Sequence, residues 1–355
     1  MHKVIRLFFK TLSVFAAIAL LLCAIVLGTA AFFNSPPEEQ PLVFEEAMRL
    51  EDDGALFLEI RSGETAQSVG RRLKNANVIR NRYFWNVLFR IDGEFIKTGS
   101  YRIELPANQT KIRSILTSGE QLLVRVTIPE GVTLKKTARI LEEEGVCSEV
   151  EFLAAANSRE ILETYRVPGP SMEGYLFPDT YLFPLGYPAR RVVAAMADTF
   201  FLRIDAIAPD APVSISAAEL NNLVILASIV EREYRISEEA AMMAGVFFNR
   251  LKIGMALQSC ATVVYVITEI QGRSHPEILY NADLEIRDPY NTYMRPGLPP
   301  GPISAPGETA LRAVFNPAPS DYLYFRLRDQ NTGQHYFSRT LDDHIRAGAL
   351  YVKVR

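Results

Sequence analysis

The sequence has few cysteines, histidines and tryptophans, and it has no excess of positive charge. Its 355 residues include 3 cysteines, 4 histidines and 1 tryptophan. One cysteine lies in an apolar N-terminal run. The other two, Cys147 and Cys260, do not make a disulfide framework, and whether they pair stays open. The formal net charge is −3 and no basic stripe is present, so we expect no nucleic-acid partner.

The patterns of several common catalytic sites are also missing. His2, His275, His335 and His344 show no ligand spacing such as i, i+4, so we expect no metal ion. No phosphate-binding loop, dinucleotide fingerprint or G-x-S-x-G elbow occurs, and no organic cofactor is implied. A nucleophilic Cys260 would need a histidine oriented beside it, which the sequence does not place. A small buried thiol is the simpler interpretation of this residue.

What the sequence does contain is enough apolar residues for a globular protein. Apolar residues make up 48% of the chain and charged residues 22%, which argues against disorder. At roughly 150 residues per domain, the length allows two or three domains.

The N-terminal region predicts a membrane anchor. Residues 11–33 carry no charge, and as a helix they would span about 34 Å, against ~30 Å for the hydrocarbon core of a bilayer. Basic residues precede this run and acidic residues dominate after it, so the positive-inside rule places residues 1–10 in the cytoplasm. A cleaved signal peptide usually has an apolar core of only about 7–15 residues. We therefore expect an uncleaved single-pass anchor, with the rest of the chain outside the cytoplasm.

After the apolar run comes an acidic linker, residues 34–55, and an internal repeat follows it. Residues 58–79 and 126–147 align without a gap. Each copy predicts a short strand, a glycine turn and an amphipathic helix capped by Thr65 or Thr133. The pattern fits two small α+β modules that act as spacers, and it equally fits a glycan-binding module of the LysM type. We predict a small LysM-like α+β region over residues 56–150.

The remainder, residues 151–355, predicts a mixed α+β domain in which Ser216 caps a helix. Helices are expected at about 190–207, 216–234 and 237–252. Segment 288–307 is too rich in proline and glycine for regular structure, and a loop of that length in a compact domain is usually functional. Residues 321–327 and 333–338 predict a β-hairpin.

Two glutamates at the end of the helix at 216–234 are the leading candidates for chemistry. In the segment "LASIVEREY", a helical wheel places Glu231 and Glu233 on the two borders of the apolar face, with Arg232 pointing away from it. A carboxyl group half-buried among apolar side chains has its pKa raised, and a general acid needs a raised pKa near neutral pH. The alternative is a pair of solvated charges on a helix face, and periodicity does not choose between the two.

Longer sequence motifs favour the catalytic interpretation of these glutamates. In order along the chain they are "EGYLFPDTY" (173–181), "LASIVERE" (226–233), "FFNRLKIGMALQ" (247–258), "YNTY" (290–293), "GLPPGPI" (297–303), "PG" (306–307) and "YLYF" (322–325). Together they closely resemble the YceG-like (MltG) family of endolytic murein transglycosylases. The resemblance covers nearly the whole chain.

The resemblance implies a lyase anchored in the bacterial inner (cytoplasmic) membrane, with its catalytic domain outside the cytoplasm. Such an enzyme cuts nascent glycan strands internally, at the β-1,4 bond from N-acetylmuramic acid to N-acetylglucosamine. The cut leaves a 1,6-anhydro end and limits strand elongation. Peptidoglycan polymerases are implied as partners besides the glycan strands.

The resemblance also implies roles for individual residues. Glu233 matches the catalytic acid and base of the family, and Glu231 matches a supporting residue. The positions that match a glycan-binding groove are Gln258, Thr262, Tyr265, Asn291, Thr292 and Tyr293.

The chain departs from the family pattern close to these positions. Cys260 and Ala261 stand where the family usually has Asp and Pro, and a thiol orients a hydroxyl less well than a carboxylate does. The departure supports an alternative function, in which the chain is a catalytically degenerate, membrane-anchored scaffold of the same family that binds peptidoglycan without cutting it.

The predicted fold is thus α+β with an N-terminal transmembrane helix. Its parts are a cytoplasmic tail (1–10), the transmembrane helix (11–33), an acidic linker (34–55), the LysM-like repeat region (56–150) and a lytic transglycosylase domain (151–355).

Overall fold

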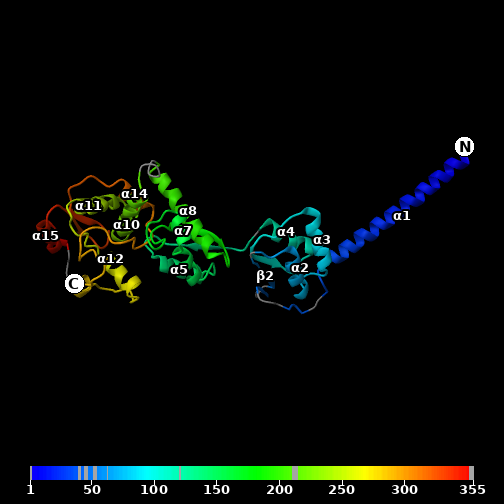
Figure 1. Ribbon diagram of the computed structural model, residues 1–355, viewed down its shortest axis with the longest axis horizontal. Coiled ribbons are helices and arrows are strands. Elements are labelled where there is room, and N and C mark those ends of the chain that lie inside the picture. The colour runs from blue at the N-terminus through cyan, green and yellow to red at the C-terminus, as the bar shows by residue number, and fades with distance from the viewer. Residues whose placement is uncertain are drawn as a thin grey trace. The chain divides into compact units, whose positions relative to one another are not determined.

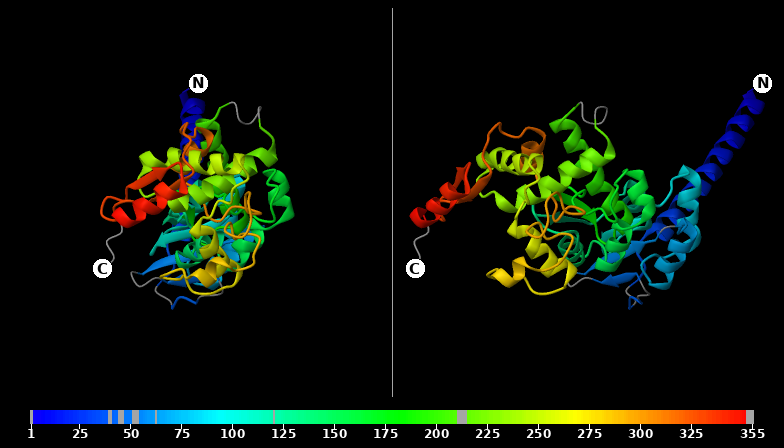
Figure 2. Two further views of the ribbon diagram at one scale, coloured as in Figure 1. Left: turned by 90° about the vertical axis from the view of Figure 1, so that its left-hand side faces the viewer. Right: turned by 60° about the vertical axis from the view of Figure 1, so that its left-hand side comes forward.

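The computed structural model describes residues 2–38, 41–43, 47–50, 54–61, 63–119, 121–209 and 215–351. Helices and strands are mixed, and the strands form small sheets rather than one large sheet (Figures 1 and 2). The chain divides into two compact units, Met1–Leu123 with Pro184–Gly186 and Val124–Phe183 with Tyr187–Arg355. Each unit contains a hydrophobic core of its own. The predicted mixed α+β class is confirmed.

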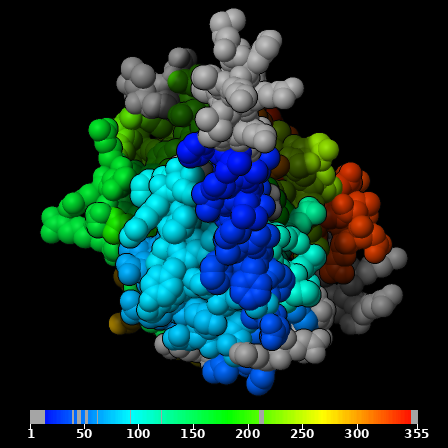
Figure 3. All heavy atoms as spheres, turned by 90° about the vertical axis from the view of Figure 1, so that its right-hand side faces the viewer, coloured from blue at the N-terminus to red at the C-terminus, as the bar shows by residue number. Residues whose placement is uncertain are grey.

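The first unit begins with α1, His2–Asn34. This helix contains a segment long and apolar enough to cross a membrane, Val14–Asn34, none of which is buried. Figure 3 shows its side chains, in blue, uncovered on the face in view. Its 21 residues extend about 32 Å as a helix, which matches the hydrocarbon core of a bilayer. An exposed apolar helix of this length is compatible with the predicted single-pass anchor.

The rest of the first unit is an antiparallel sheet with three helices. The strands β1 (Met48–Leu50), β2 (Ala55–Ile60) and β3 (Gly99–Glu104) pair in that order. The helices are α2 (Ala66–Asn75), α3 (Arg82–Asp92) and α4 (Gln109–Ser118). Trp85 on α3 is fully buried and donates to Ala66 O at 2.7 Å. A Cβ at Gly70 would lie 2.3 Å from this ring, so α2 and α3 pack closely because position 70 has no side chain.

Both helix caps predicted in the repeat are present. Thr65 Oγ1 accepts from Ser68 N at the start of α2, and Thr133 Oγ1 accepts from Lys136 N at the start of α5 (Leu134–Glu143). The strand of the second copy is β4 (Leu123–Thr127). The first copy lies in the first unit and the second copy in the second unit. The repeat as a structural unit, its LysM-like character and the domain boundaries stay predictions.

The second unit consists mainly of helices. Its first part contains α6 (Glu149–Ala156), α7 (Arg159–Thr164), β5 (Thr180–Pro184), which pairs with β4, and α8 (Ala189–Ile207). Its centre contains α10 (Ala217–Glu233), a 3-10 turn (Ser237–Glu239), α11 (Ala240–Lys252) and α14 (Glu308–Phe315). The other elements are α12 (Cys260–Tyr265), which continues into a π-helical turn (Val266–Ile270), α13 (Asn281–Leu284), the hairpin β6 (Tyr324–Leu327) and β7 (His335–Ser338), and α15 (Leu341–Tyr351). The three helices expected between 190 and 252 and the C-terminal hairpin are confirmed.

Helix α10 is the central element of this unit. It begins at the predicted N-cap, Ser216, whose side chain accepts from Glu219 N in a capping box. Residues 224–230 are all buried, and α10 packs against α11 and α14 (Figure 1). The segment 288–307 contains no helix or strand, as expected. This segment lies against α10, because Ile303 N donates to Ser228 Oγ and Ser304 Oγ donates to Ser228 O.

Candidate active site

The last turn of α10 carries both candidate glutamates. The helix ends at Glu233 because the next residue, Tyr234, has an extended backbone with φ −71° and ψ 149°. The buried run 224–230 therefore delivers Glu231 and Glu233 to the end of a rigid helix. Their surroundings differ, and the difference separates their chemistry.

Glu233 is held by a neighbouring hydroxyl and opens on a cavity. Ser259 Oγ donates to Glu233 Oε1 at 2.5 Å. Burial raises the pKa of Glu233, and this effect is opposed by the Ser259 hydrogen bond and by the charges of Arg250 and Arg232. The carboxyl group therefore keeps its proton to higher pH than an exposed glutamate, as a general acid requires.

The cavity beside Glu233 has a volume of about 520 Å³, which is within the range of ligand-binding pockets. Its walls come from the end of α10, the segment after α11, the hairpin β6–β7 and α15. The lining residues are Arg232, Glu233, Arg235, Arg250, Leu257, Gln258, Cys260, Tyr293, Tyr324, Phe325, Arg326, Leu327, His335, Leu341 and His344. A carboxyl group with a raised pKa thus faces a cavity lined by aromatic, basic and amide side chains.

Glu231 is bonded to protein groups and does not line the Glu233 cavity. Gly307 N donates to its Oε2 at 2.9 Å, and Tyr234 Oη donates to its Oε1 at 3.2 Å. Burial raises the pKa of Glu231 to about 7, the Gly307 N–H opposes this shift, and the charge of Glu130 adds to it. Its hydrogen bonds join the end of α10 to the loop that leads into α14. Both carboxyl groups have a raised pKa, one of the two alternatives that the helical wheel left open, and Glu233 lines the cavity of about 520 Å³.

Two of the residues predicted to bind glycan line the Glu233 cavity. They are Gln258 and Tyr293. Gln258 has a left-handed backbone with φ 50°, and its N–H donates to Thr292 O at 3.1 Å. This turn leaves the Gln258 side chain exposed and directs the next residue, Ser259, inward, where it is buried against Glu233.

Three other predicted glycan-binding residues, Thr262, Asn291 and Thr292, are buried and bonded to protein groups. Thr292 Oγ1 accepts from Ser259 N at 3.0 Å and lies 2.9 Å from Thr262 Oγ1. Asn291 Nδ2 donates to the carbonyls of Leu284 and Ile286. A direct contact of these three residues with glycan stays a prediction. Their positions favour a supporting role, because Thr262 and Thr292 fix the segment that carries Ser259 and Asn291 fixes the loop that carries Thr292.

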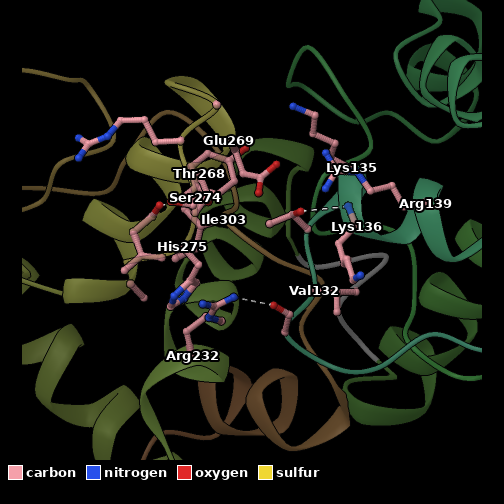
Figure 4. A pocket seen from close by; sticks show the side chains of 17 residues that line it. Val132, Lys135, Lys136, Arg139, Arg232, Thr268, Glu269, Ser274, His275 and Ile303 are labelled. Atoms are coloured by element: carbon pink, nitrogen blue, oxygen red, sulfur yellow. Dashed lines mark hydrogen bonds between the residues drawn. The ribbon is translucent and has the colours of Figure 1, made fainter. Parts of the chain in front are cut away.

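Tyr265, the last of the predicted glycan-binding residues, lines a different cavity of about 450 Å³. Its ring centre lies 5.0 Å from that of Tyr290. Figure 4 shows this second cavity, in which basic side chains from α5 face the segment 268–275.

The prediction that Cys260 is a small buried thiol is wrong, because its side chain is exposed and lines the Glu233 cavity. Its Sγ lies 3.1 Å from Tyr293 Oη. Partial burial raises the pKa of Cys260, and the Glu233 charge adds to the rise. A nucleophilic cysteine needs a lowered pKa, so this thiol is poorly suited to attack. Cys147 is buried, and neither it nor Cys260 forms a disulfide bond.

Comparison with known proteins identifies the family of this chain. A family model described as the YceG-like family matches residues 58–349. The chain belongs to this family. An endolytic murein transglycosylase of Bacillus subtilis is 28% identical over 314 residues, covering 83% of this chain and 84% of the relative. One of Streptococcus pneumoniae is 28% identical over 326 residues; the match covers 82% of this chain but only 58% of that relative, so the chain spans less than two thirds of its length.

A solved structure of the YceG-like family is similar over most of this chain. The crystal structure of a YceG-like protein from Listeria monocytogenes matches with 29% sequence identity and a TM-score of 0.55. The match covers 82% of this chain and 98% of that protein. The fold expected for a YceG-like chain is therefore present here.

Two residues of the candidate site were missed in the sequence. Ser259 lies between the predicted Gln258 and the unusual Cys260, and a serine beside two such positions was the available signal. Arg250 lies in the motif "FFNRLK" and is only 6% exposed. Its Nε donates to Leu323 O at 2.6 Å and its Nη1 to Leu257 O at 2.5 Å, so it joins the end of α11 to two walls of the cavity.

Proposed function

We propose that this YceG-like chain is a membrane-anchored endolytic lytic transglycosylase that cuts peptidoglycan strands, with Glu233 as its acid and base. The observation that carries the proposal is the Glu233 carboxyl group, which has a raised pKa, is held by Ser259 and faces a cavity of about 520 Å³. The names of the relatives, endolytic murein transglycosylases, support the same reaction.

The proposed cut is at the β-1,4 bond between N-acetylmuramic acid and N-acetylglucosamine. Protonated Glu233 gives its proton to the glycosidic oxygen as the bond from that oxygen to the muramyl C1 breaks. The muramyl 6-hydroxyl then forms the new bond to C1 and gives its proton to the Glu233 carboxylate. No water is consumed, the product carries a 1,6-anhydro end, and the acid is restored.

One carboxyl group is enough for this mechanism. Most glycosidases need a second carboxylate as nucleophile or as base for water, whereas here the nucleophile belongs to the same sugar. Ser259 Oγ and the Ala261 N–H orient the Glu233 carboxyl group beside the cavity in which the substrate would bind. Glu231 is bonded to Gly307 and Tyr234, and we assign it the supporting role of fixing the end of α10 against the loop before α14.

The α1 segment Val14–Asn34 supports a single-pass anchor for this enzyme. We propose that it lies in the cytoplasmic membrane with its basic N-terminal end inside, and that the two compact units face the glycan strands outside. Association with peptidoglycan polymerases would place the cut on newly made strands, and co-purification of full-length protein with such polymerases tests this partner.

A second candidate function, a glycan-binding scaffold that does not cut, is favoured by one observation. Cys260 replaces the expected acidic residue and lines the same cavity as Glu233, so the substitution is not remote from the proposed acid. Digestion of purified glycan strands by the full-length protein in detergent separates the two functions. The enzyme gives ends one water lighter than hydrolysed ends, and the scaffold binds strands but leaves their length unchanged.

A further inference from the structure

The second cavity, shown in Figure 4, adjoins the Glu233 cavity at the end of α10. Arg232 lines both, and Ala261 in the second cavity follows Cys260 in the first. At this boundary Ala261 is only half-buried. Its N–H stabilises the Glu233 carboxylate and opposes the rise in the pKa of Glu233. A ligand group in the second cavity would therefore lie next to a sugar bound at Glu233.

The second cavity is strongly basic. Five basic side chains line it, against one carboxylate, Glu269. The basic residues are Lys135, Lys136, Arg139, Arg232 and Arg273. Figure 4 shows that Lys135, Lys136 and Arg139 come from α5 and that Glu269, Ser274 and His275 face them. An excess of positive charge in a concave site favours an anionic ligand.

Two of these cations are already bonded to protein groups, and two are not. Arg232 Nη1 donates to Gly131 O at 2.9 Å, and Arg139 Nε lies 3.6 Å from a Glu149 carboxylate oxygen. Over the ranges that the structure describes, the ammonium groups of Lys135 and Lys136 have no hydrogen-bond or ion-pair partner. Lys135 is half-buried and Lys136 is exposed, so both can pair with a ligand at little cost to stability.

The side chains rather than the helix terminus make this basic site. The first amide of α5, Leu134 N, already donates to both carboxyl oxygens of Glu173 at 3.0 Å. Hydroxyl groups of Thr268 and Ser274 and the ring of Tyr265 complete the lining. Cations, hydroxyls and one aromatic ring are suited to a short acidic peptide.

We propose that this basic cavity binds the carboxylates of the peptide stem on the muramyl residue that is being cut. The inference rests on the proposed function. In peptidoglycan, the muramyl sugar carries a short peptide with free carboxylates on its lactyl group, so a muramyl ring at Glu233 brings such a peptide to an adjoining site. Lys135 and Lys136 pair with its carboxylates, which makes stem-bearing strands the preferred substrate.

The test compares glycan strands that bear stems with the same strands after an amidase has removed the stems. Full-length wild type should form anhydro ends about tenfold faster on stem-bearing strands, as two weak ion pairs allow, and the preference should fall as salt rises. The Lys135→Gln/Lys136→Gln double variant should bring the ratio of the two rates close to one. Lys252→Gln, which removes an exposed lysine that lines neither cavity, should leave the ratio unchanged.

Failure of this inference is distinguishable from failure of the proposed function. Wild type that cuts both kinds of strand, with a ratio that the double variant does not alter, overturns the stem site alone. If wild type cuts neither, binding of the two kinds of strand to wild type and the double variant still decides the stem site, while the proposed function fails. Displacement of stem-bearing and stem-free strands alike by inorganic pyrophosphate would overturn the assignment in favour of a phosphate ligand.

Discussion

Ser259 Oγ lies 2.5 Å from Glu233 Oε1, although 26 positions separate the two residues in the chain. This contact joins the rigid end of α10 to the segment that leads into α12. It holds the carboxyl group of the proposed acid beside the cavity in which the glycosidic oxygen would lie. Burial raises the pKa of Glu233, and this hydrogen bond makes the rise smaller.

Replacement of Ser259 with alanine should therefore change both rate and pH dependence. Without the Ser259 donor, the pKa of Glu233 rises further, and the protonated acid persists to higher pH. The alkaline limb of the kcat profile should shift to higher pH, and the maximal kcat should fall about tenfold because the carboxyl group is less well oriented. A pH–rate profile measures both changes, and an alkaline limb that does not move would contradict the role of Ser259.

Cys260 gives a second prediction about pH. Cys260→Ala should retain cleavage within about threefold of wild type, because its Sγ contacts Tyr293 Oη rather than Glu233. Cys260→Asp places a like charge near Glu233 and should shift the alkaline limb upward, because a neighbouring anion disfavours ionisation. Loss of cleavage in Cys260→Ala, with strand binding intact, would argue that the thiol takes part in the chemistry.

Thr292 should matter for both stability and activity. Thr292→Val removes the acceptor of the buried Ser259 N–H and leaves it unpaired, while Thr262 Oγ1 loses one partner and keeps Ser259 O. The expected loss is about 1–3 kcal/mol in the free energy of unfolding. Cleavage should also fall under conditions where the variant is fully folded, since Ser259 loses its support. Urea unfolding and initial rates on the same preparation measure the two effects.

Glu173 predicts a pH dependence of stability. Burial raises its pKa to about 8, against an ordinary value of 4.5, so the folded protein favours the protonated form. The stability that Glu173 contributes to the folded state is fully present below about pH 4.5 and is lost as pH rises through about 8. Glu173→Gln should therefore be more stable than wild type at pH 8.5 by roughly 1–3 kcal/mol, with little difference at pH 5. Thermal unfolding at both pH values measures this, and the exposed Glu277→Gln is the matched control.

The elements that the sequence predicts well depend on local pattern. Helix α10 begins at Ser216 as expected, because a capping residue and an apolar period are readable within a few residues. The helical wheel placed Glu231 and Glu233 at the borders of the apolar face but did not decide between a raised pKa and solvated charges, and burial in the fold raises the pKa of both. The site is less predictable because distant segments decide it.

Three features of the site show where prediction from sequence stops. Glu231 and Glu233 look equivalent on a helical wheel, and their partners Gly307 and Ser259, distant in the chain, distinguish them. Cys260 was expected to be buried, but the left-handed turn at Gln258 exposes it and buries Ser259 instead. Motif matching also placed Thr262, Asn291 and Thr292 in the groove, since it does not separate residues that line a site from residues that support it.

The most direct test of the central claim compares Glu233→Gln with Glu231→Gln in full-length protein. Both variants should fold and bind glycan strands, because an amide is close in size and keeps one oxygen acceptor. Glu233→Gln should form 1,6-anhydro ends at least about 1,000-fold more slowly than wild type, whereas Glu231→Gln should lose far less, about tenfold. If Glu231→Gln abolishes anhydro ends while Glu233→Gln retains them, the acid assigned here is the wrong one.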